Sequence, residues 1–153
     1  MSDKLVYSVE KPWSVNAWVD ADQYQRMYQQ SIKDPNGFWS EQSDEFLSWQ
    51  KPWKTLRDVD FLTAKTSWFI DGKLNVSVNC IDRHLENNAN TTAIIWEGDE
   101  PDTHLMITYA ELFEQVSKFG NLLRKQGVKK GDRVCIYMPM IPEAAYAMLA
   151  CAR

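Results

Sequence analysis

The most constraining feature of this sequence is an apolar run near its carboxyl end, at residues 134–138. A turn at Gly131 and Asp132 precedes the run and Pro139 follows it, a pattern typical of a strand buried on both faces of a sheet. A second apolar block follows at helical spacing, and Pro142 stands where the first turn of a helix favours proline. Because such a strand needs two neighbours and such a helix needs a sheet beneath it, we expect this chain to be the opening part of a larger protein.

Composition restricts the classes of function. The chain has 153 residues, about the length of one domain, and its 44% hydrophobic and 25% charged residues are ordinary for a soluble globular protein. A net charge of −4 without a basic stripe argues against a nucleic-acid partner. One basic cluster is interpreted as a solvated turn, and it consists of Lys125, Lys129, Lys130 and Arg133.

The three cysteines indicate neither a disulfide framework nor a zinc site, because their number is odd and no CxxC pair occurs. Cys135 and Cys151 stand in apolar contexts and are predicted to be buried thiols. No signal-peptide pattern follows Met1, and the longest apolar run is too short to cross a bilayer. These features favour a cytoplasmic protein without a membrane partner.

The first 70 residues are rich in aromatic side chains and contain two predicted helices. Asp20 and Gln23 resemble a capping box that begins the first, and Asp34 with Pro35 begins the second. A short strand is predicted at residues 67–70, before a turn. We interpret the aromatic side chains as packing against a neighbouring surface. A platform that stacks sugars or bases is the alternative, which the lack of a basic groove disfavours.

Residues 74–89 are predicted to form one helix. It contains Asp82, Arg83 and His84 in succession, a triplet that invites a catalytic interpretation. Consecutive side chains on a helix do not face one another, so we interpret the triplet as surface ion pairing with a capping contact from His84.

Two strands at residues 92–96 and 104–107 predict a hairpin. The acidic turn between them, residues 97–102, lacks the alternating ligand spacing of a calcium loop and is interpreted as a solvated turn. Thr108 and Glu111 predict a capping box.

The capping box begins a helix at residues 108–126, and Gly127 is the predicted left-handed cap at its end. With the strand at 133–138 and the helix from Pro142, the order strand, helix, strand, helix predicts a βαβα unit of a doubly wound sheet. The expected fold class is α/β.

Motifs that carry chemistry are missing from this sequence. It contains no GxGxxG, GxxxxGK[ST], HExxH or GxSxG, and its six glycines are too scattered for a phosphate-binding loop. His84 and His104 are too few for a metal site, and neither stands beside a serine or cysteine nucleophile. We predict no catalytic, cofactor-binding or metal-binding residue in this chain.

Several long blocks resemble AMP-forming acetyl-coenzyme A synthetases, among them residues 79–85, which read NCIDRHL against the family's NCxDRHL. The other blocks lie at residues 74–75, 93–99, 108–112, 127–132, 136–140, 142–144 and 148–153, and residues between 24 and 39 resemble the family's N-terminal extension. The resemblance implies the adenylate-forming fold, with residues 1–70 as that extension and residues 71–153 as an incomplete start of the AMP-binding α/β domain.

The resemblance also implies a function for the parent protein. The family joins acetate to ATP, giving acetyl-adenylate and pyrophosphate, and then transfers the acetyl group to the thiol of coenzyme A. ATP, magnesium and CoA are therefore expected as ligands of the parent, and the remainder of its chain as the partner of this one. In the family the phosphate loop, the ligands of ATP and magnesium, and the CoA contacts come after the position of Arg153. This chain alone is therefore predicted to be inactive.

Two alternatives stay open. Propionyl- and acetoacetyl-CoA synthetases share the blocks at residues 138–140, 143–144 and 149–153, and the acyl pocket lies outside this chain. A non-enzymatic module is the other alternative, in which the aromatic-rich first 60 residues dock on a full-length ligase or another partner.

Overall fold

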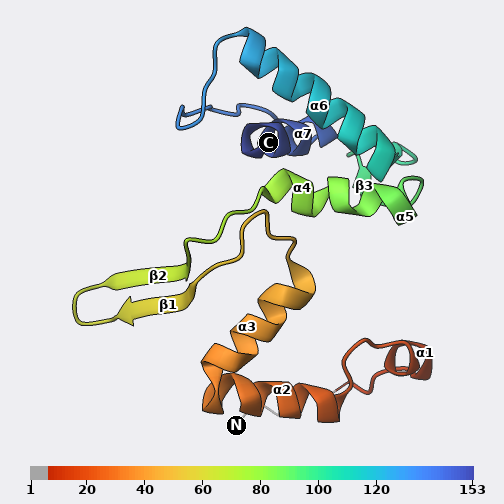
Figure 1. The fold of residues 1–153 in the computed structure, drawn as a ribbon. Helices are drawn as coiled ribbons and strands as arrows, with labels where there is room; N and C mark the ends of the chain where they lie inside the picture. Colours follow the sequence, from red (N-terminus) through yellow and green to blue (C-terminus); the bar gives the residue numbers. More distant parts are fainter. Residues whose placement is uncertain (1–6) are drawn as a thin grey trace. The chain divides into compact units, whose positions relative to one another are not determined.

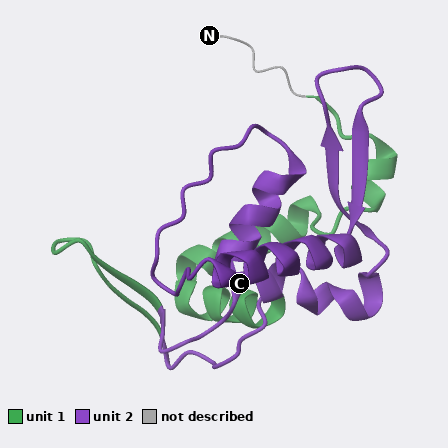
Figure 2. Ribbon diagram, turned by 90° about the horizontal axis from the view of Figure 1, so that it is seen from above, with its two compact units in different colours: residues 1–46, 56–68 green, residues 47–55, 69–153 purple. Residues whose placement is uncertain are grey.

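The computed structural model describes residues 7–153, which divide into two compact units (Figure 2). Within the described part, the first unit contains residues 7–46 and 56–68, and the second contains residues 47–55 and 69–153. Over the same part of the chain, no helix combines the length and the apolar character that crossing a membrane requires.

The first unit contains three helices and most of a hairpin (Figure 1). The helices are α1 (Lys11–Val15), α2 (Ala21–Lys33) and α3 (Pro35–Phe46). The predicted capping box of α2 is present, because the Gln23 amide donates to Asp20 Oδ1 at 2.7 Å and the Asp20 amide donates to Gln23 Oε1 at 2.9 Å. The predicted cap of α3 is also present, since the Gly37 amide donates to Asp34 Oδ1 at 3.0 Å.

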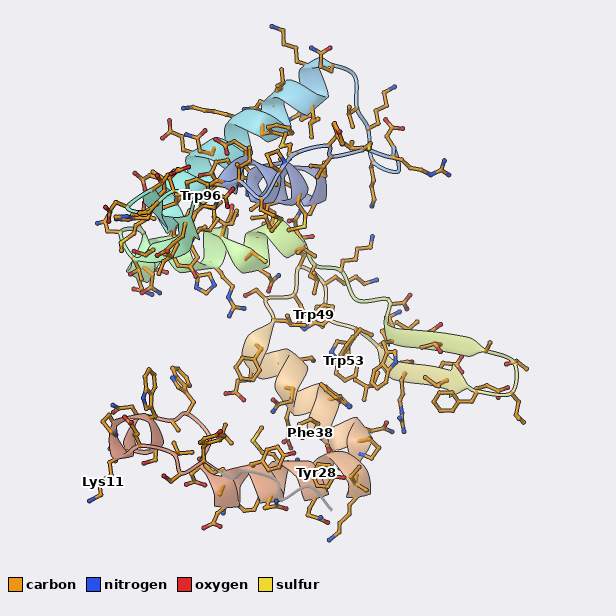
Figure 3. All side chains as sticks on the ribbon, turned by 180° about the vertical axis from the view of Figure 1, so that it is seen from behind. Lys11, Tyr28, Phe38, Trp49, Trp53 and Trp96 are labelled. Carbon is orange, nitrogen blue, oxygen red and sulfur yellow. The ribbon has the colours of Figure 1, made fainter. Side chains whose placement is uncertain are left out.

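The hairpin consists of β1 (Thr55–Asp60) and β2 (Lys65–Ile70), which pair in a two-stranded sheet. The sequence analysis predicted only the second strand, at residues 67–70, which is two residues shorter than β2. Beside its base, within the second unit, the rings of Trp49 and Trp53 lie 5.4 Å and 6.1 Å from that of Phe69, centroid to centroid (Figure 3). These aromatic side chains pack against one another.

The second unit also holds the main apolar core. Its elements are α4 (Val76–Cys80), η1 (Asp82–His84), α5 (Leu85–Asn88), β3 (Thr92–Glu97), β4 (His104–Thr108), α6 (Tyr109–Lys125) and α7 (Pro142–Ala152). Strands β3 and β4 form the predicted antiparallel hairpin. Buried side chains from η1's start, β4, α6 and α7 meet in one cluster of Ile81, Ile107, Leu112, Val116 and Ala150.

The predicted helix at residues 74–89 is broken into α4, η1 and α5. The break is at Ile81, whose φ of −125° and ψ of −66° leave the helical region. Its side chain is fully buried in the core cluster. Tertiary packing of one apolar side chain therefore overrides the helical periodicity of the sequence.

The predicted strand at residues 133–138 is also not formed. The segment is extended but does not pair with any other part of residues 7–153, and Tyr137 is 99% exposed. A strand exists only where its backbone groups have hydrogen-bonding neighbours, and the described residues do not supply them. The mixed α/β class is confirmed, whereas the parallel pairing of a βαβα unit is not present.

The predictions that Cys135 and Cys151 are buried were wrong. Cys135 and Cys151 are exposed, as is Cys80. Cys135 belongs to the uncovered segment at 133–138, and Cys151 lines an open hollow beside α7.

Candidate functional site

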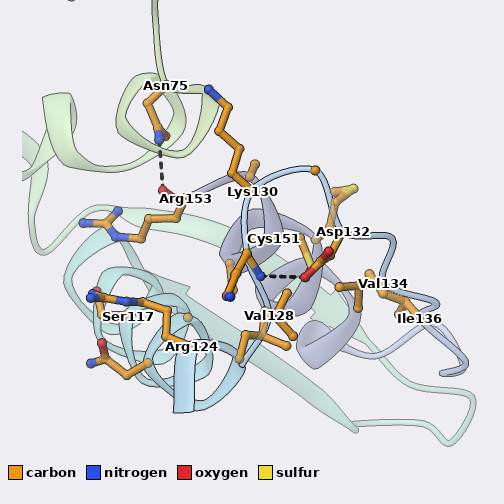
Figure 4. A pocket seen from close by; sticks show the side chains of 18 of the residues that line it. Asn75, Ser117, Arg124, Val128, Lys130, Asp132, Val134, Ile136, Cys151 and Arg153 are labelled. Carbon is orange, nitrogen blue, oxygen red and sulfur yellow. Dashed lines mark hydrogen bonds between the residues drawn. The ribbon is translucent and has the colours of Figure 1, made fainter. Parts of the chain in front are cut away.

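The second unit contains a hollow of about 1150 Å³ (Figure 4). It is bounded by α6, α7 and the segment at residues 128–136. Part of its wall is apolar, with Val128, Val134 and Ile136 among the residues that line it. Such a hollow, beside an unpaired extended segment, suits the packing of further protein. A partly apolar hollow of this size also suits a ligand.

One edge of this hollow is closed by Arg153. Its guanidinium donates two hydrogen bonds of 2.7 Å to the carboxylate of Asp82 and one of 3.3 Å to Ser77 Oγ. It also lies 4.9 Å from the centre of the Phe113 ring. The hydrogen bonds with Asp82 raise the pKa of Arg153, although burial opposes them. The backbone carbonyl of Arg153 accepts from Asn75 Nδ2 at 3.2 Å (Figure 4).

The triplet at residues 82–84 does not form a catalytic group. Asp82 pairs with Arg153, whereas Arg83 donates to Asn79 Oδ1 at 3.5 Å. The ring of His84 lies 4.9 Å from that of Tyr109, and the side chain makes no capping hydrogen bond. The predicted capping contact of His84 was therefore wrong. The ion pair of Asp82 joins two elements 71 residues apart and is not the pairing along one helix surface that was predicted.

A contact of Trp96 was also missed by the sequence prediction. Its indole Nε1 donates to the Met140 carbonyl at 2.7 Å and so joins β3 to the start of α7. Nearby on α7, burial raises the pKa of Tyr146, and the carboxylates of Glu143 and Glu111 add to the effect. The apolar context of Trp96 predicted a strand, and nothing in the sequence indicated the partner of its N–H group.

The charged turns are exposed to solvent. The Lys129 amide donates to Asp132 Oδ2 at 2.7 Å and closes the basic turn. Its four basic side chains, Lys125, Lys129, Lys130 and Arg133, belong to exposed residues, as predicted. In the acidic turn at residues 97–102, the charged residues are likewise exposed.

The described residues contain no site for the metal ion that the resemblance implies. Within residues 7–153, no three or more His, Cys, Asp or Glu side chains are grouped so as to hold a metal ion. At the start of α6, the Glu111 amide donates to Thr108 Oγ1 at 3.2 Å, so a side chain of the chain itself already occupies that helix end.

Comparison with known proteins agrees with the resemblance. A family model described as the acetyl-coenzyme A synthetase N-terminus matches residues 24–80, and one described as an AMP-binding enzyme matches residues 81–153. Acetyl-coenzyme A synthetases from Saccharophagus degradans and Alcanivorax borkumensis are 55% and 54% identical to this chain, in alignments that cover all 153 of its residues. One from Bradyrhizobium diazoefficiens is 56% identical over 155 aligned positions. This chain spans only 24% of the length of each of these relatives.

The fold of this chain is also similar to that of a solved acyl-CoA synthetase. The structure of an acetoacetyl-CoA synthetase from Streptomyces lividans superposes with a TM-score of 0.74 at 28% sequence identity. The match covers 84% of this chain and 20% of that one. By sequence, the chain corresponds to the N-terminal portion of acetyl-coenzyme A synthetases, and its fold is similar to that of an acetoacetyl-CoA synthetase.

Proposed function

We propose that the protein containing this chain is an AMP-forming acetate–CoA ligase. It joins acetate to ATP with release of pyrophosphate and then transfers the acetyl group to CoA. The observation that carries the proposal is 51–56% identity to acetyl-coenzyme A synthetases along the whole chain. The cytoplasm, where a protein with free exposed thiols stays reduced, is the proposed location.

The chain's own part in this activity is architectural. We propose residues 1–70 as the N-terminal extension and residues 71–153 as the start of the AMP-binding domain. The two family models occur in the same order, although they meet ten residues later, between residues 80 and 81. The contacts with ATP, magnesium, acetate and CoA are assigned to other parts of the protein. The carboxylate of Asp82 supports this assignment, because both of its oxygens already accept hydrogen bonds from Arg153.

The extended segment at residues 133–138 has a structural role in this proposal. Its backbone is extended and its side chains are exposed, as in a strand whose neighbours are supplied by other residues. The helix α7 after it is anchored by the bond from Trp96 to Met140 at one end and by Arg153 at the other. Because α7 is anchored at both ends, the segment that leads into it is held in a position where other strands can pair with it.

Acetate-dependent exchange between pyrophosphate and ATP tests the proposal. We expect no exchange with the 153-residue chain alone. A chimera in which this chain replaces the corresponding quarter of the Saccharophagus degradans relative is expected to catalyse it, with the unaltered relative as the control. Robust exchange by the purified chain would refute the architectural role. A folded chimera that is inactive with acetate would refute the ligase assignment.

Acyl specificity is tested in the same assay. Acetate is proposed over acetoacetate because the relatives named for acetyl-CoA are 51–56% identical, whereas the acetoacetyl-CoA synthetase structure is 28% identical. The chimera should use acetate in preference to propionate and acetoacetate. A preference for either competitor would replace the proposed substrate.

A docking module is a second candidate, favoured by the exposure of aromatic side chains in the first unit. Trp13 and Trp18 are 74% and 95% exposed. Capture of a purified full-length ligase by the 153-residue chain would support this candidate, provided that Trp13→Ser and Trp18→Ser weaken the capture.

A further inference from the structure

The turn of the β1–β2 hairpin presents two large apolar side chains to solvent. Phe61 is 91% exposed and Leu62 is 98% exposed, and they are adjacent in the chain. We call these two residues the hairpin tip. Neither the core of the second unit nor the proposed ligase activity accounts for them.

Hydrogen bonds close the turn that carries the hairpin tip. Asp60 Oδ1 accepts from the Leu62 amide at 2.9 Å, and Asp60 Oδ2 accepts from the Thr63 hydroxyl at 2.9 Å. These bonds, that from Thr63 first, lower the pKa of Asp60. Ala64 closes the turn with a φ of +55°. A turn whose backbone is already fixed loses less conformational freedom when it binds, so this arrangement favours docking.

The strands below the tip are also held together. An ion pair joins Lys65 to Asp58, and the guanidinium of Arg57 lies 5.7 Å from the centre of the Trp68 ring. Even so, the sheet has only two strands, and an isolated two-stranded sheet is marginally stable in water. The hairpin therefore gains most from a surface that covers it.

We propose that the hairpin tip inserts into an apolar pocket formed by the polypeptide that follows Arg153 in the full-length protein. The inference rests on the proposed function, because the relatives are about four times as long as this chain, which spans 24% of them. It goes beyond that function by naming the two side chains that connect the extension to the rest of the enzyme.

The small size of the tip favours the same polypeptide over a second copy as its partner. One aromatic side chain buries about 150–250 Å², whereas a stable association of separate proteins buries roughly 800 Å² on each partner. Two side chains fall short of that area. Within one polypeptide the cost of bringing two molecules together does not arise, so a small contact suffices.

Limited chymotrypsin digestion of the full-length protein tests the inference, because the protease cuts after Phe61 and Leu62 when they are accessible. We expect cleavage there to be at least tenfold slower in the full-length protein than in the 153-residue chain. Phe113 and Phe119, which pack at the core, are the internal reference for a folded second unit. Cleavage at the tip that is equally fast in both proteins, and faster than at the reference sites, would overturn the inference. Protection that disappears on dilution would also overturn it, because it would assign the pocket to a second copy.

A pair of variants gives a second measurement on the full-length protein. The double variant Phe61→Ser, Leu62→Ser is expected to lower the Tm of the full-length protein and to leave that of the 153-residue chain unchanged. Thr66→Ser, at an exposed position of β2 on the same hairpin, is the matched control. An equal effect of the double variant on both proteins would contradict a pocket beyond Arg153.

The two proposals fail separately. Acetate-dependent exchange is measured on the same full-length preparation as the digestion. Protection of the tip without ligase activity refutes the proposed function alone, and ligase activity without protection refutes the hairpin inference alone.

Discussion

Arg153 at the end of α7 holds Asp82 of η1 through two parallel hydrogen bonds of 2.7 Å, although 71 residues separate them in the sequence. The side chains are only 25% and 27% exposed. A bidentate pair of this kind is stronger than a single hydrogen bond between neutral groups and fixes direction as well as distance. It fastens the last helix to the short helices that precede β3.

Arg153→Ala is expected to lower the free energy of unfolding of the 153-residue chain by about 1–2 kcal/mol, between the values typical of exposed and of buried ion pairs. Arg153→Lys should recover only part of the loss, because an ammonium group cannot donate the parallel pair of bonds. Urea unfolding followed by circular dichroism gives both values.

The matched control is Lys118→Ala. Lys118 pairs with Glu114 one turn away on α6, and both side chains are at least 60% exposed. We expect this substitution to lower the free energy of unfolding by less than about 0.5 kcal/mol. Equal losses for Arg153→Ala and Lys118→Ala would show that the long-range pair does not fasten α7.

Local signals predicted the starts of the helices well. The capping boxes at Asp20 and at Thr108 both form, and so does the cap at Asp34. These motifs bond backbone amides that lie within three residues of them. Both partners of each bond can therefore be recognised in one short stretch of sequence. The hairpin of β3 and β4 was predicted for a similar reason, since its strands are separated by a short polar turn.

Features that depend on distant residues could not be predicted in this way. The break at Ile81 occurs because its side chain reaches a core contributed by β4, α6 and α7. The partner of Asp82 and the partner of the Trp96 indole lie 71 and 44 residues away. Val134 to Met138 has the composition of a buried strand, but pairing needs neighbours that residues 7–153 do not provide.

Gly127 ends α6 in the left-handed region, with a φ of +86°. Its amide donates to the Arg124 carbonyl at 3.0 Å, and the Val128 amide donates to the Leu123 carbonyl at 3.1 Å. This pattern of two bonds at a helix end favours glycine. Gly127→Ala is therefore expected to lower the free energy of unfolding by about 1 kcal/mol.

Substitution of Gly120 by alanine, in the same helix, is expected to have the opposite effect on stability. It lies inside α6, and a Cβ added there would meet nothing within 4 Å. Gly120→Ala should raise the free energy of unfolding by about 0.5–1 kcal/mol, because alanine restricts the unfolded chain and favours the helix. Thermal unfolding of both variants checks the pair. A loss of stability from Gly120→Ala, or none from Gly127→Ala, would contradict the backbone argument.

The capping box of α6 predicts a pH dependence. Hydrogen bonds from the Thr108 amide and hydroxyl lower the pKa of Glu111 below its ordinary value of 4.5. Because the folded state lowers this pKa, the stabilisation is complete above pH 4.5 and is lost as the pH falls through the folded value. Thr108→Ala should cost about 1 kcal/mol at pH 7.

The control for the pH effect is Glu111→Gln. Glutamine still accepts from the Thr108 amide but does not titrate, so its stability should fall less steeply below pH 4.5 than that of the unaltered chain. Urea unfolding between pH 3 and pH 7 compares the two. Parallel curves would mean that Glu111 does not contribute to the acid sensitivity.

Tyr137 and Met140 predict how the 153-residue chain behaves in solution. Their side chains are 99% and 91% exposed, in or next to the unpaired segment at 133–138. Exposed apolar groups beside an unpaired extended backbone favour association, so the chain should bind a hydrophobic dye or self-associate. The double variant Tyr137→Ser, Met140→Ser should lower dye fluorescence and self-association, and it should change the free energy of unfolding by less than about 0.5 kcal/mol. Dye titration and sedimentation velocity measure the two effects.

Lys130→Ser is the matched control for this variant, because it changes an exposed side chain of the preceding turn without removing apolar surface. It should leave dye binding unchanged. A chain that stays monomeric and binds no dye would contradict the prediction. The segment would then already be covered by residues of its own chain, and the strand that we assign to it in the full-length enzyme would lose its support.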